Sequence, residues 1–382
     1  MSTADMSTAD VSTGRGRAGV HATCCGQTSG MDESWHPCCP PPTGLVLPVR
    51  RGTDVRDGPP PGALRGRGWR SVSRGWHLPA AVPRTPEQRA CEVVVRLPPG
   101  ALVTGWASLR LSGANYFEGL ASNRETPLPV PVLPPHSVRI RGPGVRVART
   151  RLLLPEAVIL YGVPCVPADL ALLHEISRAA TPREAGIMVD MALAAGVVDL
   201  DRLRAEAGRR RLPAAAAYGL ERACAECRSP RESDMLQVWE GVAGLPRPLM
   251  NREVRDLSGR LLAVVDLLDV EAGGCGEFNG ASHRSAARQS RDEKRNAALR
   301  EVDLETFTVV GSDSDRVQVD RMNAARSRAA WARPTDRRWL VGAFVPAPAI
   351  VVPDPEEVER EAIMLQHYAE LEARLVGERS GS

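Results

Sequence analysis

The sequence predicts two folded regions: an α/β domain at residues 229–331, with a central mixed sheet flanked by helices, and an α+β region at residues 45–225. In the first region, amphipathic and strand-like segments follow one another in the order α, β, β, β, α, β, α. In the second, short strands interrupted by Pro and Gly precede several helical segments. A chain of 382 residues with 43% hydrophobic content can bury the cores of about two or three domains.

The charge balance of the chain gives no general indication of its partners. The net charge is only +3, so a nucleic-acid site has to be local. Almost all positive charge is Arg, with Lys294 the only lysine, and the abundance of Ala, Gly and Pro indicates a high-GC coding bias. There is no apolar run of about 18 residues and no signal-like N-terminus. We therefore expect no membrane partner and a cytoplasmic location.

The nine cysteines argue against a disulfide framework because their number is odd and the chain is long. Zinc binding by the Cys-Cys pairs before residue 40, or by Cys224 and Cys227, is the less favoured alternative. A structural zinc site needs four ligands on an ordered scaffold, and no such scaffold is predicted around the first pairs. We interpret Cys224 and Cys227 as ordinary thiols on a helix.

The first elements are short and irregular. Residues 1–44, which begin with a repeated MSTAD, predict a disordered tail, and Met31 is an alternative start. The segment GWRSVSRGWHLP, residues 68–79, predicts a β-hairpin. Residues 92–114 predict a short helix, a Pro-Pro-Gly turn and a second helix, and residues 127–153 predict several short strands.

Three helices are predicted to link the two regions. They span Pro167–Ala179, Pro182–Ala195 and Leu200–Arg210. Thr181 is the N-cap of the second, and Pro182 occupies its first turn. His174, on the first, is interpreted as a packing residue because no partner for catalysis lies near it in the sequence.

The α/β domain begins at Ser229, which forms a capping-box pattern with Glu232, and its first helix is expected to end at Gly244. Leu249–Asp256 and Arg260–Asp269 predict a hairpin of two strands. The remaining elements are predicted as a strand at 275–279, a helix at 284–301, a strand at 304–311 and a helix at 315–331.

Two acids in this domain are candidate metal ligands. Asp266 interrupts the apolar run LLAVVDLLD, and a carboxylate in a buried strand is costly unless it is paired or binds a cation. Glu277, on the next strand, is expected at the same sheet edge, with Glu232 projecting from the preceding helix. Oxygen-rich sites suit Mg²⁺ or Mn²⁺, which promote phosphodiester hydrolysis. For Glu232, capping alone is an equally good interpretation.

The helix after Glu277 places four arginines on one face, where the phosphates of DNA entering the site would meet them. The alternative is a solvated face, partly neutralised by Asp292 and Glu293. The four are Arg284, Arg288, Arg291 and Arg295.

These stretches resemble a known family. SPRES, VVDLLD, GEFNGASHR and RDEKRNAALRE, all within residues 229–331, are similar to motifs of the very short patch repair endonuclease branch of the PD-(D/E)XK nuclease superfamily. Residues 45–338 are also similar to actinobacterial proteins in which such a domain follows a region reminiscent of abortive-infection antitoxins. In that comparison the 45–225 region is antitoxin-like or winged-helix-like, with a helical linker.

The resemblance implies roles for five residues. It makes Asp266 and Glu277 the metal ligands, Glu232 an accessory acid and His283 a catalytic histidine, and it places Asn279 where the superfamily has lysine. The chain departs from the family pattern because Val265, not proline, precedes the first acid. Asn279 cannot carry the charge of the lysine that orients the attacking water. His283, whose ordinary pKa is about 6.5, is the candidate general base.

Residues 332–382 predict a C-terminal extension with a Pro-rich, strand-like run at residues 341–355. A helix follows, and its apolar stripe contains Met364, Tyr368, Leu371 and Leu375. Such a stripe usually packs on its own domain, and the alternative is a homodimer. The first expectation for function is thus a metal-dependent DNA endonuclease or nickase. The second is a catalytically inactive, antitoxin-like DNA-binding regulator, and the third is a dimeric interaction protein.

Overall fold

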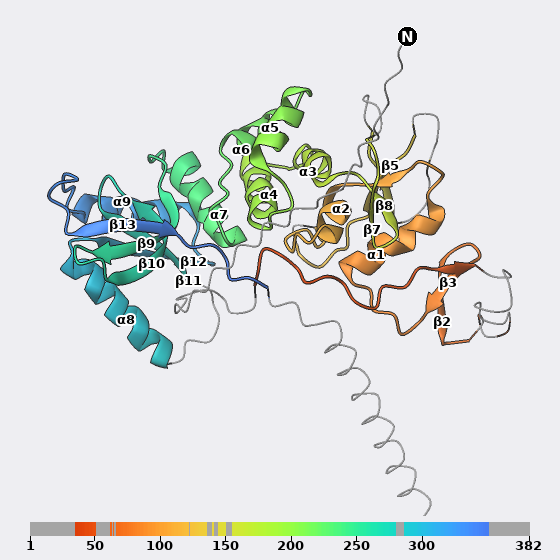
Figure 1. Cartoon of the computed structure of the whole chain (residues 1–382), viewed down its shortest axis with the longest axis horizontal. Coiled ribbons are helices and arrows are strands. Elements are labelled where there is room, and N and C mark those ends of the chain that lie inside the picture. Colours follow the sequence, from red (N-terminus) through yellow and green to blue (C-terminus); the bar gives the residue numbers. More distant parts are fainter. Residues whose placement is uncertain are drawn as a thin grey trace, which may run out of the picture.

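The computed structural model describes residues 35–50, 62, 64, 66–121, 123–135, 140, 144–149, 155–279 and 286–350, with the backbone alone for 286–291. Figure 1 shows two small sheets at one end, a group of helices in the middle and a larger sheet at the other end. The mixed helix and strand content that the sequence predicts is confirmed. Among the described residues, none of the helices is both long enough and apolar enough to cross a bilayer.

The N-terminal region contains two sheets. The predicted hairpin is confirmed by β2 (Trp69–Ser73) and β3 (Trp76–Pro79), which pair antiparallel. The first sheet has the order β1-β3-β2, and the second has the order β6-β5-β4-β8-β7. The other strands are β1 (Val49–Arg50), β4 (Leu102–Val103), β5 (Val130–Leu133), β6 (Val145–Val147), β7 (Val158–Leu160) and β8 (Val163–Cys165).

The first helix of this region lies earlier than predicted. Helix α1 spans Pro86–Val93, because the hydroxyl of Thr85 accepts the amide of Gln88 at 3.1 Å and caps it. A single 3₁₀ turn at Val94–Arg96 follows. Helix α2 (Gly105–Leu111) is the predicted second helix, and it begins after a short strand.

Four helices form the middle of the chain. They are α3 (Ala168–Ile176), α4 (Pro182–Ala194), α5 (Leu200–Gly208) and α6 (Ala214–Glu221). The predicted cap of α4 is confirmed, since Thr181 accepts the Glu184 amide at 3.1 Å. Helix α6 was not predicted; it packs closely on α4, because a Cβ at Gly219 would lie 2.6 Å from the backbone nitrogen of Gly186.

His174 is a packing residue, as predicted. Its Nδ1 lies 2.7 Å from the hydroxyl of Thr104. Burial lowers the pKa of His174 to about 4, so it is neutral near pH 7. The prediction that Cys224 and Cys227 lie on a helix is wrong: they lie at the two ends of a tight turn between α6 and the next helix.

The large sheet has the order β12-β11-β10-β9-β13. Strand β11 pairs parallel with β12, and the other neighbours are antiparallel. Its strands are β9 (Leu249–Asp256), β10 (Leu261–Asp269), β11 (Gly274–Asn279), β12 (Glu305–Val310) and β13 (Trp339–Phe344). Its helices are α7 (Pro230–Gln237), which continues as a π-helical turn at Val238–Val242, α8 (Ala286–Glu301) and α9 (Asp315–Arg328).

These elements confirm the predicted order of helices and strands, but the predicted end at residue 331 is wrong. Strand β13 pairs with β9 at the sheet edge, and Trp339 is buried there. The sheet therefore extends to Phe344, into the segment assigned to the C-terminal extension. The C-terminal helix and its proposed dimer contact lie outside the described residues.

Two buried clusters hold the helices to this sheet. One joins α7, its π-helical turn and α9 to the strands through Trp239, Leu267, Phe307 and Met322. The other includes Leu299, at the end of α8, with residues of β9, β10, β11 and β13. In Figure 1, α8 and α9 lie on opposite sides of the sheet. The apolar residues of the strands thus meet helices on both faces.

The prediction of a disordered tail over residues 1–44 is wrong for residues 35–44. Residues 35–44 are bound to the folded chain: the amide of Cys39 donates to the carbonyl of Gly113 at 2.8 Å, and the amide of Asn115 donates to that of Pro37 at 2.8 Å. These backbone hydrogen bonds hold a Pro-rich stretch that lacks apolar periodicity. Residues 1–34 lie outside the described residues.

Trp239 is expected to be a main contributor to the stability of the sheet domain. It is fully buried, its ring stacks on Phe307 at 6.0 Å, and its Nε1 donates to Pro246 at 2.7 Å. Trp239→Ala should lower the free energy of unfolding by about 3–5 kcal/mol. The control Leu257→Ala, at an exposed turn, should stay within about 0.5 kcal/mol. Urea denaturation measures both, and equal effects would contradict this packing.

Candidate functional site

The two acids lie on neighbouring strands and on the same face of the sheet. Strands β10 and β11 pair antiparallel with Leu267 opposite Gly276 and Leu268 opposite Cys275. One further step of this register places Asp266 opposite Glu277, and directly opposite residues share a face. Both side chains are buried. The predicted proximity of the two acids is consistent with this register.

The backbone pairing of β10 with β11 ends at Leu267 and Gly276, and beyond it the carboxylate of Asp266 accepts a backbone amide of β11. Its Oδ2 accepts the amide of Phe278 at 2.9 Å. This bond fixes the carboxylate at the end of the β10–β11 ladder, next to Glu277. A hydrogen bond to the charged form favours ionisation, so it offsets part of the cost of burying Asp266.

The buried Arg228 and the partly buried Arg295 supply the positive charge. The Nη2 atom of Arg228, in the segment before α7, lies 3.7 Å from Oδ1 of Asp266. The Nη1 atom of Arg295, on α8, lies 3.1 Å from Oε2 of Glu277. Three elements thus converge on the acids: the segment before α7, the β10–β11 pair and α8.

Glu232 lies close enough to influence the acids but is held by its own hydrogen bonds. Its carboxylate accepts the Arg228 amide at 2.8 Å, the Asn251 side-chain amide at 2.6 Å and the Ser229 hydroxyl at 3.1 Å. The hydroxyl of Ser229 in turn accepts the Glu232 amide at 3.2 Å. Ser229 is therefore confirmed as the N-cap, but the reciprocal bond of a capping box is not formed, because the carboxylate of Glu232 accepts the amide of Arg228 and not that of Ser229.

The electrostatics of the site favour protonated acids. Burial raises the pKa of Asp266 well above its usual range, and the charges of Glu277 and Glu232 raise it further. Burial raises the pKa of Glu277 to about 7, against the opposing effect of Arg295. Strongly shifted carboxyl groups in a cluster are typical of functional sites, although structural ion pairs produce them too.

The carboxylates of Asp266 and Glu277 are the groups at this site that could bind a divalent cation. Within the described residues, no group of three or more His, Cys, Asp or Glu side chains is arranged to hold a metal. Buried Oε1 of Glu277 has no hydrogen-bond partner among those residues and is available as a ligand. Mg²⁺ often binds through one or two carboxylates and keeps several waters. The donor set therefore fits Mg²⁺ or Mn²⁺ as a two-carboxylate site.

The other predicted site residues are only partly described. Asn279 ends β11, two residues after Glu277, so both lie on the same face of the strand. His283 and Arg284 lie outside the described residues. Arg288 and Arg291 are placed on α8 by backbone alone.

Arg295 differs from the prediction. It was expected to contact phosphate together with the other three arginines on one face of α8, but its side chain is largely buried and paired with Glu277. The helical periodicity gives the face of α8 on which Arg295 lies. It does not indicate whether that face meets the sheet or the solvent.

Three contributors to the site were not predicted. Arg228 and Asn251 both contact the acid cluster, and both are buried. Asn251 has φ +51°, a left-handed backbone conformation that asparagine tolerates better than most residues. Arg228 has no distinguishing signal in the sequence beyond its place directly before the N-cap. Phe278, the residue between the two site positions, contributes its backbone amide.

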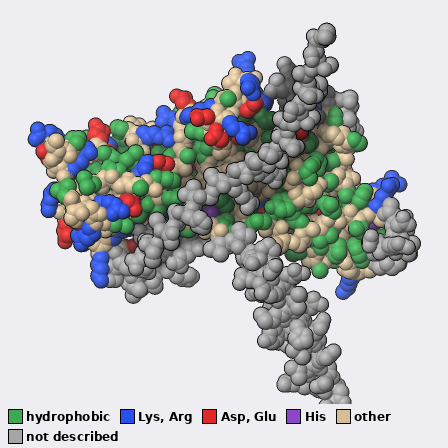
Figure 2. Space-filling model, in the orientation of Figure 1, with side chains coloured by type: hydrophobic (Ala, Val, Ile, Leu, Met, Phe, Trp, Pro, Cys, Tyr) green, Lys and Arg blue, Asp and Glu red, His purple; other side chains and the backbone are tan. Residues whose placement is uncertain are grey.

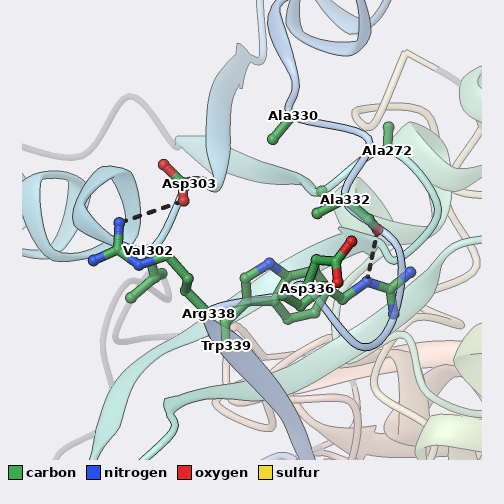
Figure 3. A pocket seen from close by; sticks show the side chains of 10 residues that line it. Ala272, Val302, Asp303, Ala330, Ala332, Asp336, Arg338 and Trp339 are labelled. Atoms are coloured by element: carbon green, nitrogen blue, oxygen red, sulfur yellow. Dashed lines mark hydrogen bonds and ion pairs between the residues drawn. The ribbon is translucent and has the colours of Figure 1, made fainter.

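Two pockets adjoin the domain at other places. The pocket in Figure 3 is lined by Val302, Asp303, Asp336 and Trp339, and there Arg338 pairs with Asp303 at 3.4 Å. A second pocket, of about 290 Å³, lies between α4, α7, α9 and the ends of β11 and β12. Its lining includes Arg183, Arg231, Phe278 and Gln318. Neither pocket is lined by the two acids.

The surface carries charges of both signs. Figure 2 shows Arg and Lys side chains interspersed with Asp and Glu at the left and upper edges of the face it presents. An interaction with nucleic acid would thus depend on local arginines. Compared with known protein families, curated proteins and solved structures, the chain gives no significant match.

The raised pKa of Glu277 predicts a specific pH dependence of stability. The folded protein holds this proton more tightly than the unfolded chain, whose glutamate has an ordinary pKa of 4.5. The resulting stabilisation is complete below about pH 4.5 and is lost as the pH rises through about 7. In this window the slope should approach about 1.4 kcal/mol per pH unit.

Glu277→Gln should remove this contribution to the slope, because glutamine cannot release a proton, whereas Asp266, whose pKa is also raised, still contributes. The measurement is urea denaturation of both proteins between pH 4.5 and 8 in the presence of a chelator. Parallel stability curves for the variant and the unmodified protein would show that Glu277 does not titrate in this way.

Proposed function

We propose that residues 229–344 form a metal-dependent DNA endonuclease or nickase domain with Asp266 and Glu277 as metal ligands. The observation that carries this proposal is the pairing of β10 with β11, which brings the two buried carboxylates to one face. Burial raises the pKa of both acids, and the charge of Glu277 raises that of Asp266 further, as expected where carboxyl groups meet in a buried site. An ion pair that only stabilises the fold requires one acid for each arginine, and it does not require a second acid beside the first.

The metal proposed for this site is Mg²⁺ or Mn²⁺. Oε1 of Glu277 and the Oδ1 atom of Asp266, whose nearest cation is 3.7 Å away, are the atoms that would hold it. When bound, such an ion polarises a phosphoryl oxygen of the substrate. The ion would neutralise the two carboxylates in place of Arg228 and Arg295, which could then stabilise negative charge on phosphate.

The residues around the acids have supporting roles in this proposal. Glu232 positions the start of α7 through its three hydrogen bonds, and its charge adds to the negative potential at Asp266. Asn279 offers a neutral amide on the face of Glu277, where the resemblance implies lysine. His283 is proposed as the general base, and Arg284, Arg288 and Arg291 as contacts to DNA phosphate.

The fold is compatible with this proposal. A central mixed sheet flanked by helices is what the resemblance to the PD-(D/E)XK superfamily implies for this domain. The preceding α+β region and the helices α3 to α6 would then serve as the regulatory or DNA-binding part. Fold alone does not establish function, so the proposal depends on the acid pair.

Plasmid nicking tests the proposal directly. With Mg²⁺ or Mn²⁺, the full chain should convert supercoiled plasmid into nicked or linear forms, and a chelator should stop the reaction. Asp266→Asn should reduce the rate by more than the roughly 10- to 100-fold typical for loss of an outer-shell partner of a metal. The matched control is Glu253→Gln, an acid of β9 that pairs with Arg255, and it should leave the rate unchanged.

Two outcomes of the nicking assay would contradict the proposal. If duplex, branched and mismatched DNA all remain intact with either metal, the endonuclease proposal fails. If cleavage occurs but is the same in Asp266→Asn, the metal site lies elsewhere.

A second candidate is a catalytically inactive DNA-binding regulator that keeps the nuclease-like fold. It is favoured by the ion pairs of Arg228 and Arg295, which already neutralise the acids, and by the uncharged Asn279. In this case the arginines are permanent structural partners, and the acids need no metal.

The two candidates differ in their response to salt and metal. A regulator should bind duplex DNA with an association constant whose logarithm falls linearly with the logarithm of salt concentration, because phosphate contacts release counterions. Fluorescence anisotropy should give the same curves with or without Mg²⁺ and with Asp266→Asn, and no strand should be cut. Metal-dependent binding that this substitution weakens would instead favour the enzyme.

A further inference from the structure

Cys224 and Cys227 occupy the two ends of a tight turn. Ala225 and Glu226 form the turn between them, in the loop that joins α6 to α7. The ends of a β-turn lie within about 7 Å, and a disulfide requires Cα atoms about 4.4–6.8 Å apart. The spacing therefore permits a disulfide without rearrangement of the chain. Both cysteines are free thiols.

The two thiols have different surroundings. Cys224 is 7% exposed, whereas Cys227 is completely buried. Arg247 lies against the first of them: it donates to the carbonyl of Ala223 at 2.9 Å and to that of Arg222 at 3.2 Å. A guanidinium at this position stabilises a thiolate.

The two thiols differ in pKa because their surroundings differ. A hydrogen bond from the Cys227 thiol, with a smaller contribution from Arg247, lowers the pKa of Cys224 to about 7. The same hydrogen bond and burial raise the pKa of Cys227. Among the seven described cysteines, the pKa is lowered only at Cys224 and is raised at the others.

The turn is anchored on two sides. The carboxylate of Asp190, buried on α4, accepts the amide of Cys224 at 2.6 Å and the hydroxyl of Ser233 at 2.6 Å. On the other side, Asn251 of β9 donates to the carbonyl of Glu226 at 2.7 Å. The positions of the two sulfurs are thus held by contacts that do not depend on a bond between them.

We propose that Cys224 and Cys227 form a redox-active dithiol that is converted into an intramolecular disulfide by exchange with small disulfides. The geometry of the turn, the 7% exposure of Cys224 and the complete burial of Cys227 match an attacking and a resolving cysteine. A metal site is the weaker interpretation, because the described residues near the pair supply no third ligand. The proposal is independent of the proposed nuclease function.

The exchange is balanced in two steps. The Cys224 thiolate attacks one sulfur of a small disulfide RS–SR, forms a mixed disulfide and releases RS⁻. The Cys227 thiol then loses its proton to a released thiolate and attacks the sulfur of Cys224, which expels the second RS⁻. The protein dithiol is oxidised by two electrons, and the small disulfide is reduced to two RSH molecules, the second RS⁻ taking from water the proton that Cys224 lost on ionisation.

A tryptic digest can isolate the pair. Cleavage after Arg222 and Arg228 releases a peptide, Ala223–Arg228, that contains both cysteines and no other. The reduced full chain is incubated with oxidised glutathione at pH 7, and remaining thiols are blocked with N-ethylmaleimide before digestion. Mass spectrometry should find this peptide lighter by two hydrogens and unblocked. A peptide that carries two maleimide groups would overturn the proposal.

Single substitutions distinguish the two roles. In Cys227→Ser, Cys224 should retain glutathione as a stable mixed disulfide. In Cys224→Ser, Cys227 should remain unmodified in the folded protein, because it is fully buried. The control Cys91→Ser removes another fully buried thiol and should leave the Cys224–Cys227 disulfide unchanged. Equal glutathionylation of both single variants would contradict the assignment.

The rate in the unmodified protein is a second test, which needs no variant. The first step should speed up as the pH rises and level off above about pH 7, where Cys224 is a thiolate. The charged or titratable groups that face the pair are Arg247, Asp190, Glu232 and, across the turn, the partner thiol. Arg247→Gln should move the midpoint to higher pH. A rate that continues to rise up to pH 9 would show that Cys224 is an ordinary thiol.

Discussion

The burial of two carboxylates side by side is the constraint on which the large sheet and its helices depend. Asp266 and Glu277 are both nearly inaccessible to solvent, and like charges so placed repel each other strongly. Arg228 reaches them from the start of α7 and Arg295 from α8. The charge balance therefore joins a helix N-terminus, two strands and a second helix at one point, in addition to the apolar clusters on both faces of the sheet.

This arrangement explains why one geometry supports two candidate functions. Breaking a buried ion pair is costly because it leaves a charge without a partner, so the arginines stabilise the fold whether or not a metal binds. A divalent cation would take over that role and free both guanidinium groups. The difference between an enzyme and an inactive regulator is therefore the relative affinity of the acids for an ion and for the two arginines, which depends on the exact positions of a few atoms.

Much of the sheet domain could be predicted from the sequence, and the reasons are local. Ser229 caps α7, β9 has the predicted bounds and β10 begins one residue later than predicted, because hydrophobic periodicity and capping depend on neighbouring residues. Helix α6 was missed because an Ala-rich segment without a capping side chain has a weak local signal. Strand β13 overlaps the strand-like run at residues 341–355, but its pairing with β9 was not predicted, because a long-range pairing has no local signal. The prediction of disorder was wrong for residues 35–44, because they are ordered by hydrogen bonds to residues far along the chain.

By itself the sequence determined which residue types were available: an acid within an apolar strand, a second acid on the next strand and two cysteines separated by two residues. Only the tertiary structure decided what they face. It turned Arg295 inward to Glu277, brought Arg228 and Asn251 to the acids and placed Asp190 and Arg247 beside Cys224. Side-chain periodicity specifies a face of a helix or strand, whereas the partner on that face comes from segments far away in the chain and is set by packing and charge neutralisation.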